Sequence, residues 1–135
     1  MIELSNTTAQ TIAVGASVTF NTVLLKTGCG ECHRKNTGSV KLCAKGGIYQ
    51  VYFAGNIGGA TAGTPVQLNI SLGGEVLPET TMIATPAAAN DVNNVATTTT
   101  IKNCCCDYDR ITLVNTGTTA LTVGANPTLF VKRIA

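Results

Sequence analysis

The stretch GIYQVYF at residues 47–53 indicates most clearly what kind of fold this chain adopts. Large apolar side chains fall on alternate residues, Tyr49, Val51 and Phe53, which places them on one face of a β-strand. The run VQLNISL at residues 66–72 alternates in the same way. Each run is short and bounded by glycine, as strands of a sandwich are. The fold is therefore expected to be built from strands.

Outward from these two runs, the same pattern recurs at short intervals, separated by Gly, Asn and Pro. We expect about eight to ten strands, at residues 11–14, 17–25, 39–43, 48–55, 66–72, 75–84, 91–102, 108–115, 120–124 and 128–135. Pro78 interrupts one of them, because proline cannot donate to a strand ladder. The polar segments 26–38 and 86–91 read as surface loops. The sequence predicts an all-β sandwich in a single domain over residues 1–135.

The composition of the 135 residues excludes several classes of function. Charged residues make up 12%, and nine Lys and Arg against seven Asp and Glu leave a formal charge of +2. Nucleic-acid and anionic membrane partners usually require a concentrated basic surface. No apolar run approaches the ~20 residues that span a bilayer, and the first residues lack the pattern of a signal peptide. We expect no nucleic-acid partner, no membrane partner and no secretion signal.

Four stretches resemble the jelly roll of the C1q and tumour necrosis factor (TNF) type. They are GIYQVYF at 47–53, LNISLGGE at 68–75, ITLVN at 111–115 and LFVKRI at 129–134. More narrowly, residues 33–40, 75–78 and 82–88 and the cysteines near Cys105 resemble small uncharacterised proteins of phages and prophages of anaerobic Firmicutes. The resemblance implies a jelly-roll β-sandwich that assembles as a homotrimer.

The motif Cys29-Gly30-Glu31-Cys32-His33 has the spacing of metal ligands. Cys29, Cys32 and His33 are candidate zinc ligands, completed by Cys43 or by the cysteines at 104–106. The motif also matches the attachment site of c-type haem, with Met82 as a distal ligand, but it stands alone in a chain with no other histidine. We expect no cofactor, with structural zinc as the alternative.

Disulfide bonding competes with zinc for the same residues. If successive jelly-roll strands reverse direction, the loop of Cys29 and Cys32 lies at one end of the sandwich and Cys43 at the other. A possible disulfide cluster at that other end consists of Cys43, Cys104, Cys105 and Cys106. Free thiols and bonds between subunits remain open alternatives.

The sequence supports a catalytic site less well than a metal site or a disulfide. Cys32 and His33 are adjacent, and adjacent strand residues point to opposite faces, which is unsuited to a nucleophile and its base. Asp107 and Asp109 are spaced to bind calcium or to act as an acid and base pair, but a solvated loop edge explains them as well. The sequence predicts no enzyme.

The function expected is that of a phage virion structural protein, a trimeric capsid decoration or a fibre or knob component. Its partners would be other virion proteins or a host surface receptor, and it would be made in the bacterial cytoplasm and reside in the virion. Candidate contact residues are His33, Arg34 and Lys35 in the first loop and Asn90 in the second. The alternative is a carbohydrate- or protein-binding module of a bacterial surface or spore coat, like the C-terminal domains of collagen-like proteins.

Overall fold

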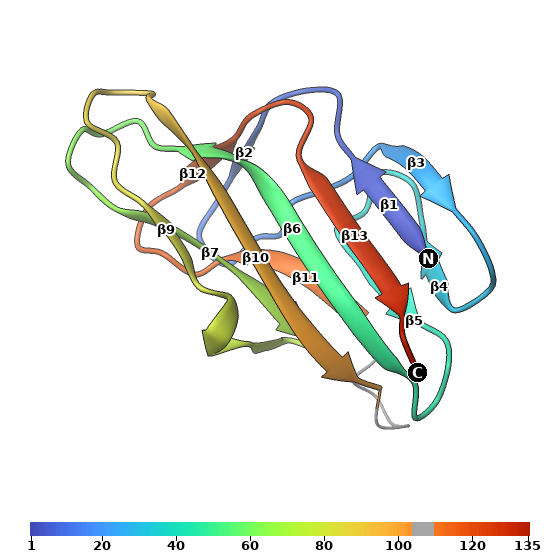
Figure 1. Cartoon of the computed structure of the whole chain (residues 1–135). Helices are drawn as coiled ribbons and strands as arrows, with labels where there is room; N and C mark the ends of the chain where they lie inside the picture. Colours follow the sequence, from blue (N-terminus) through green and yellow to red (C-terminus); the bar gives the residue numbers. More distant parts are fainter. Residues whose placement is uncertain (104–109) are drawn as a thin grey trace.

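The computed structural model describes residues 1–103 and 110–135, and β-strands dominate this part of the chain (Figure 1). Their bounds, with one short 3₁₀ helix, are β1 Ile2–Ser5, β2 Gln10–Ile12, β3 Thr22–Lys26, β4 Glu31–His33, β5 Val40–Leu42, β6 Ile48–Gly58, β7 Val66–Leu72, β8 Glu75–Val76, η1 Pro78–Thr80, β9 Met82–Ala84, β10 Val92–Lys102, β11 Arg110–Asn115, β12 Leu121–Val123 and β13 Thr128–Arg133. None of the helical structure in the described ranges is long and apolar enough to cross a bilayer.

The strands form two antiparallel sheets (Figure 1). Sheet A has the order β2-β12-β6-β13-β1-β3, with β10 on the free side of β6. Sheet B has the order β4-β5-β11-β7-β8, with β9 also beside β7. The strands β9 and β10 lie together on one long side of the sandwich, and β3 and β4 lie on the other. This two-sheet arrangement confirms the predicted jelly-roll fold class.

The core lies between the two sheets and is built from the alternating residues that the sequence indicates. Tyr49, Val51 and Phe53 of β6 are fully buried. They share one core cluster with Leu68 and Ile70 of β7. Removing such side chains from water supplies the main driving force for folding, at about 25 cal/mol per Å² of apolar surface.

The first third of the chain departs from the prediction. The strand expected at 17–25 is confined to Thr22–Lys26, although Val18 and Phe20 are buried as their alternation indicates. The strands β1 and β4 were not predicted. Both are three or four residues long, and their pairing with distant partners, β13 and β5, decides their conformation more than any local pattern does.

Candidate functional site

Most of the predicted site residues that the structure describes lie on or next to the hairpin of β4 and β5, at one edge of sheet B. In its register Glu31 faces Leu42, Cys32 faces Lys41 and His33 faces Val40. The turn between the two strands closes on Arg34, whose carbonyl accepts bonds from the Thr37 amide and hydroxyl, at 3.1 and 2.6 Å. Asn36 takes the left-handed conformation that this turn requires (φ 66°). The predicted 26–38 loop is therefore in part a strand, with its basic residues at a turn.

The hairpin corrects the predicted separation of the cysteines. The sulfur atoms of Cys32 and Cys43 are 3.0 Å apart, so the two residues lie at the same end of the sandwich. The prediction failed because β4 reverses the chain once more and brings the 28–32 segment back beside the end of β5. Cys29, on the bend before β4, is exposed. The predicted partners of Cys43 in the cluster, Cys104, Cys105 and Cys106, lie outside the described residues.

His33 braces the hairpin against the preceding segment. Its Nδ1 is 3.0 Å from the Ser39 carbonyl oxygen and its Nε2 is 3.2 Å from the Phe20 carbonyl oxygen. The imidazole also meets the Phe20 ring edge-on, with 6.4 Å between centroids. Because carbonyl oxygens occupy both nitrogens, metal ligation by His33 would require it to give up one of these contacts.

The described residues do not supply a full set of zinc ligands. Across residues 1–103 and 110–135, no three His, Cys, Asp or Glu side chains gather in a way that could hold a metal ion. Cys29, Cys32 and His33 therefore remain a predicted partial set. The predicted calcium or acid–base residues, Asp107 and Asp109, lie outside the described part of the chain.

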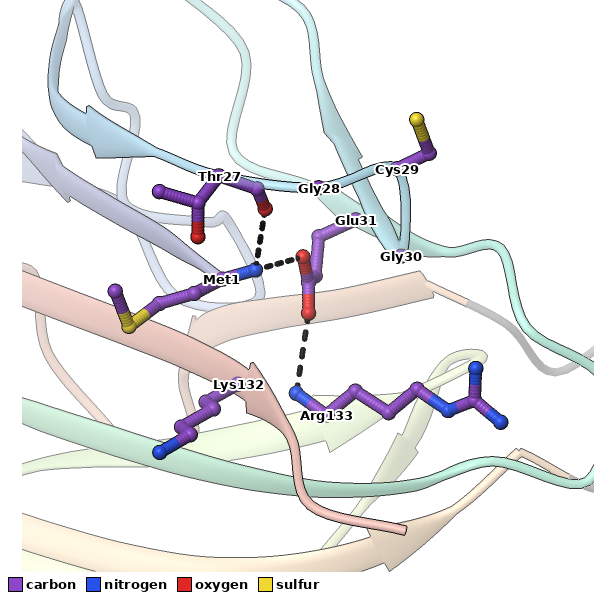
Figure 2. Close-up of a pocket in the computed structure, with 8 residues that line it drawn as sticks. All are labelled: Met1, Thr27, Gly28, Cys29, Gly30, Glu31, Lys132 and Arg133. Atoms are coloured by element: carbon purple, nitrogen blue, oxygen red, sulfur yellow. Dashed lines mark hydrogen bonds and ion pairs between the residues drawn. The ribbon is translucent and has the colours of Figure 1, made fainter.

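A buried carboxylate anchors the start of the hairpin to both ends of the chain (Figure 2). The side chain of Glu31 is only 1% exposed, and its Oε2 accepts a bond from the Met1 ammonium at 2.5 Å. Its Oε1 accepts a bond from the backbone amide of Arg133 at 3.1 Å. These residues line a cavity of about 440 Å³ together with Thr27, Cys29 and Lys132. Sequence reasoning missed Glu31, because nothing local distinguishes a buried acid from a solvated one.

A second cavity of about 480 Å³ opens on the outer face of the hairpin. Its lining includes the basic side chains of His33, Arg34, Lys41 and Arg110, with Cys32, Thr37 and Ser39 completing it. Arg110 of β11 faces Lys41 of β5 in register, so this row of charge crosses two strands. Two of the predicted contact residues, His33 and Arg34, thus line a concave surface together with Lys41 and Arg110.

The second predicted contact loop lies elsewhere. Residues 86–91 precede β10 and lie on the opposite side of the sandwich from β4 in Figure 1. Asn90 is exposed and left-handed (φ 65°), and its amide donates to the Gly59 carbonyl at 2.9 Å. The two predicted contact loops therefore do not form one surface on a single subunit.

Comparison with known proteins supports the fold and leaves the function open. No family model matches the sequence, and no curated protein matches it. Among solved structures, PRD1 vertex protein P5 is similar with a TM-score of 0.55 at 16% identity, covering 99% of this chain and 96% of its own. Murine APRIL at pH 5.0 is similar with a TM-score of 0.61 at 17% identity, covering 97% and 96%.

A further structure of murine APRIL, at pH 8.0, gives a TM-score of 0.60 at 16% identity over 98% of this chain and 97% of its own. The fold is therefore a TNF-like jelly roll, in agreement with the predicted class. The narrower likeness to phage proteins of Firmicutes finds no match by sequence and stays a prediction.

Proposed function

We propose that this protein is a non-enzymatic structural component of a phage particle that assembles as a homotrimer. Capsid decoration is the first assignment, and a fibre tip or receptor-binding knob is the second. The similarity of the fold to PRD1 vertex protein P5 supports a place in a virion. The observation that carries the assembly is the exposed surface of the two strands at the long sides of the sandwich, β10 and β3, each of which has one charged residue.

One long side ends in the edge strand β10. Within the described residues its eleven positions pair with β6 and no other strand, and Lys102 is the charged residue among them. Long edge strands without charges are prone to further association unless something covers them. Tyr52, 40% exposed on the neighbouring strand β6, faces Thr98 in register. This side therefore offers a flat polar and aromatic surface suited to burial against another subunit.

The other long side ends in β3, whose one strand partner in the described part of the chain is β1. It exposes three consecutive apolar side chains, with 46% of Val23, 55% of Leu24 and 41% of Leu25 accessible. A closed ring of identical subunits needs two different surfaces on each subunit, one for each neighbour. The β10 side of one subunit and the β3 side of the next meet that requirement. A trimer also presents each contact loop three times, which strengthens weak binding through avidity.

Native mass spectrometry tests the assembly, with an expected mass of three times 13.9 kDa. Leu24→Glu and Thr98→Glu place a charge on each side in turn, and both should give monomers. Val14→Glu is the matched control, because Val14 is 54% exposed and lies in the turn after β2, outside β3, β6 and β10. A wild-type protein that is monomeric at micromolar concentration would refute the proposed assembly.

A role in the particle is tested by deleting the gene from the phage that encodes it and adding the purified protein to the resulting particles. A decoration protein should sediment with the capsid, and a knob should restore adsorption to the host. Protein that neither binds the particles nor restores adsorption would overturn the virion assignment.

The alternative, a carbohydrate- or protein-binding module of a bacterial surface, has the basic cavity of the hairpin as its specific support. Arg34 and Arg110 both line this cavity, and a site with such groups would favour an anionic ligand. Binding of the isolated protein to anionic glycans, lost in Arg110→Ala, would favour this module over the virion role.

A further inference from the structure

The arrangement of Cys32 and Cys43 goes beyond the proposed function. Cys32 faces Lys41 in the β4–β5 register, and the Cys43 amide donates to the Gly30 carbonyl at 2.8 Å, which places Cys43 opposite Gly30. The two cysteines are thus diagonal neighbours across one antiparallel pair. Both are exposed, with their sulfur atoms 3.0 Å apart.

This geometry places two thiols within closing distance of a covalent bond. A disulfide bond is about 2.05 Å long, so the sulfur atoms have about 1 Å to close. Because the two backbones are already hydrogen-bonded to each other, a small adjustment of the two side chains is enough. Exposure gives an oxidant direct access to either sulfur.

We propose that Cys32 and Cys43 of one subunit form a disulfide that fastens β4 to β5 when the protein meets a small-molecule disulfide such as oxidised glutathione. One protein thiolate attacks a sulfur of the oxidant, forming a mixed disulfide and releasing one glutathione thiol. The second protein thiolate then attacks the protein sulfur of that mixed disulfide and releases the second glutathione thiol. The protein loses two electrons and two protons in all, and the two glutathione thiols formed take them up.

The bond would act on a short strand at the edge of sheet B. The strand β4 has three residues, and β5 is its one backbone partner in the described residues. The ring closed by the bond contains the turn with Arg34 and Lys35, and the residue before Cys32 is the buried Glu31. Oxidation would therefore fix the position of the turn between β4 and β5, which carries the candidate contact residues Arg34 and Lys35.

The chain carries convenient cleavage sites for the test. Trypsin cuts after Lys26, Arg34, Lys41 and Lys45, so Cys32 leaves in peptide 27–34 and Cys43 in peptide 42–45. The purified protein is treated with oxidised glutathione, blocked with N-ethylmaleimide and digested without reduction. The expected product is peptide 27–34 linked to peptide 42–45. Cys29→Ser should retain this link, and Cys32→Ser should abolish it.

Several results would overturn the proposal. Complete alkylation of the cysteines would show that no disulfide forms, and a bond within peptide 27–34 or a link from peptide 42–45 to peptide 103–110 would show a different pairing. A dimer band on a non-reducing gel that carries the link between peptides 27–34 and 42–45 would show that the bond joins two subunits. A mass increment that a chelator removes, with both thiols protected until then, would equally replace the disulfide by a metal site.

Thermal unfolding supplies a second measurement that does not depend on digestion. A disulfide closing a loop of this length should raise the midpoint of unfolding by about 10 °C. Reduction should therefore lower the midpoint of the oxidised wild type and of Cys29→Ser by about that amount, and should lower the midpoint of Cys32→Ser by much less. Equal effects in all three proteins would contradict the proposal.

Discussion

Tyr49 offers the sharpest test of how the core strand supports the hairpin. Its ring is fully buried in β6, and its hydroxyl donates to the Gly30 carbonyl at 2.8 Å and accepts from the Ala44 amide at 3.1 Å. One hydroxyl therefore satisfies two backbone groups, one on each side of the hairpin. Tyr49→Phe keeps the ring and removes both bonds.

The loss of stability expected for Tyr49→Phe follows from these contacts. A net hydrogen bond contributes about 1 kcal/mol, and a polar group left unpaired in a buried position costs about 1–3 kcal/mol. Loss of both bonds should thus lower the free energy of unfolding by about 2–3 kcal/mol. For a chain of this size, the midpoint of thermal unfolding should fall by about 6–12 °C.

Urea denaturation at one fixed protein concentration measures the change, because unfolding of an oligomer depends on concentration. Thr118→Val is the control, since it also removes a hydroxyl, from an exposed residue between β11 and β12 that lies outside the proposed subunit interface. This control should change the free energy of unfolding by less than about 0.5 kcal/mol. If Tyr49→Phe costs no more than Thr118→Val, the two bonds do not support the hairpin and the reasoning fails.

Two further predictions concern buried polar groups. Glu31→Gln removes the negative charge that the Met1 ammonium faces, and should lower the free energy of unfolding by about 2–4 kcal/mol in urea denaturation. Glu75→Gln, exposed on β8, is the near-neutral control, and an equal effect of both would contradict a structural ion pair. The side-chain amide nitrogen of Asn115 donates to the carbonyls of Ile12 and Thr119, both at 3.0 Å. Asn115→Ala should cost about 2–4 kcal/mol and speed amide exchange at residues 12–14, and unchanged exchange there would show that this link does not hold β2.

The strands that the sequence predicted well are those whose pattern is long enough to read locally. Residues 66–72 form β7 with the predicted bounds, and β10 begins one residue after the predicted start at 91. Pro78 does interrupt its segment, as the first residue of η1 between β8 and β9. The period of two indicates β7, the four consecutive threonines suit the strand β10, and the missing amide of proline explains the break at Pro78.

The site was less predictable, because pairing over long distances creates it. Glu31 looks like a loop residue until β4 pairs with β5 and the ends of the chain close over it. The predicted separation of Cys32 and Cys43 was wrong for the same reason. The strand β4, three residues long and not predicted, places Cys32 at the same end of the sandwich as Cys43. A motif such as C-x-x-C fixes spacing along the chain, whereas chemistry depends on which strand lies beside it.

The two proposals concern different sheets of the sandwich. The proposed disulfide joins β4 to the end of β5 in sheet B, while the strands β3 and β10 that carry the proposed subunit contacts belong to sheet A. A charge at Thr98 should therefore abolish the trimer and leave the link between peptides 27–34 and 42–45 intact. Conversely, Cys32→Ser should leave the trimer mass unchanged. If both variants lost both properties, the hairpin would have to be part of the subunit interface, and β4 would replace β3 as the surface that meets β10.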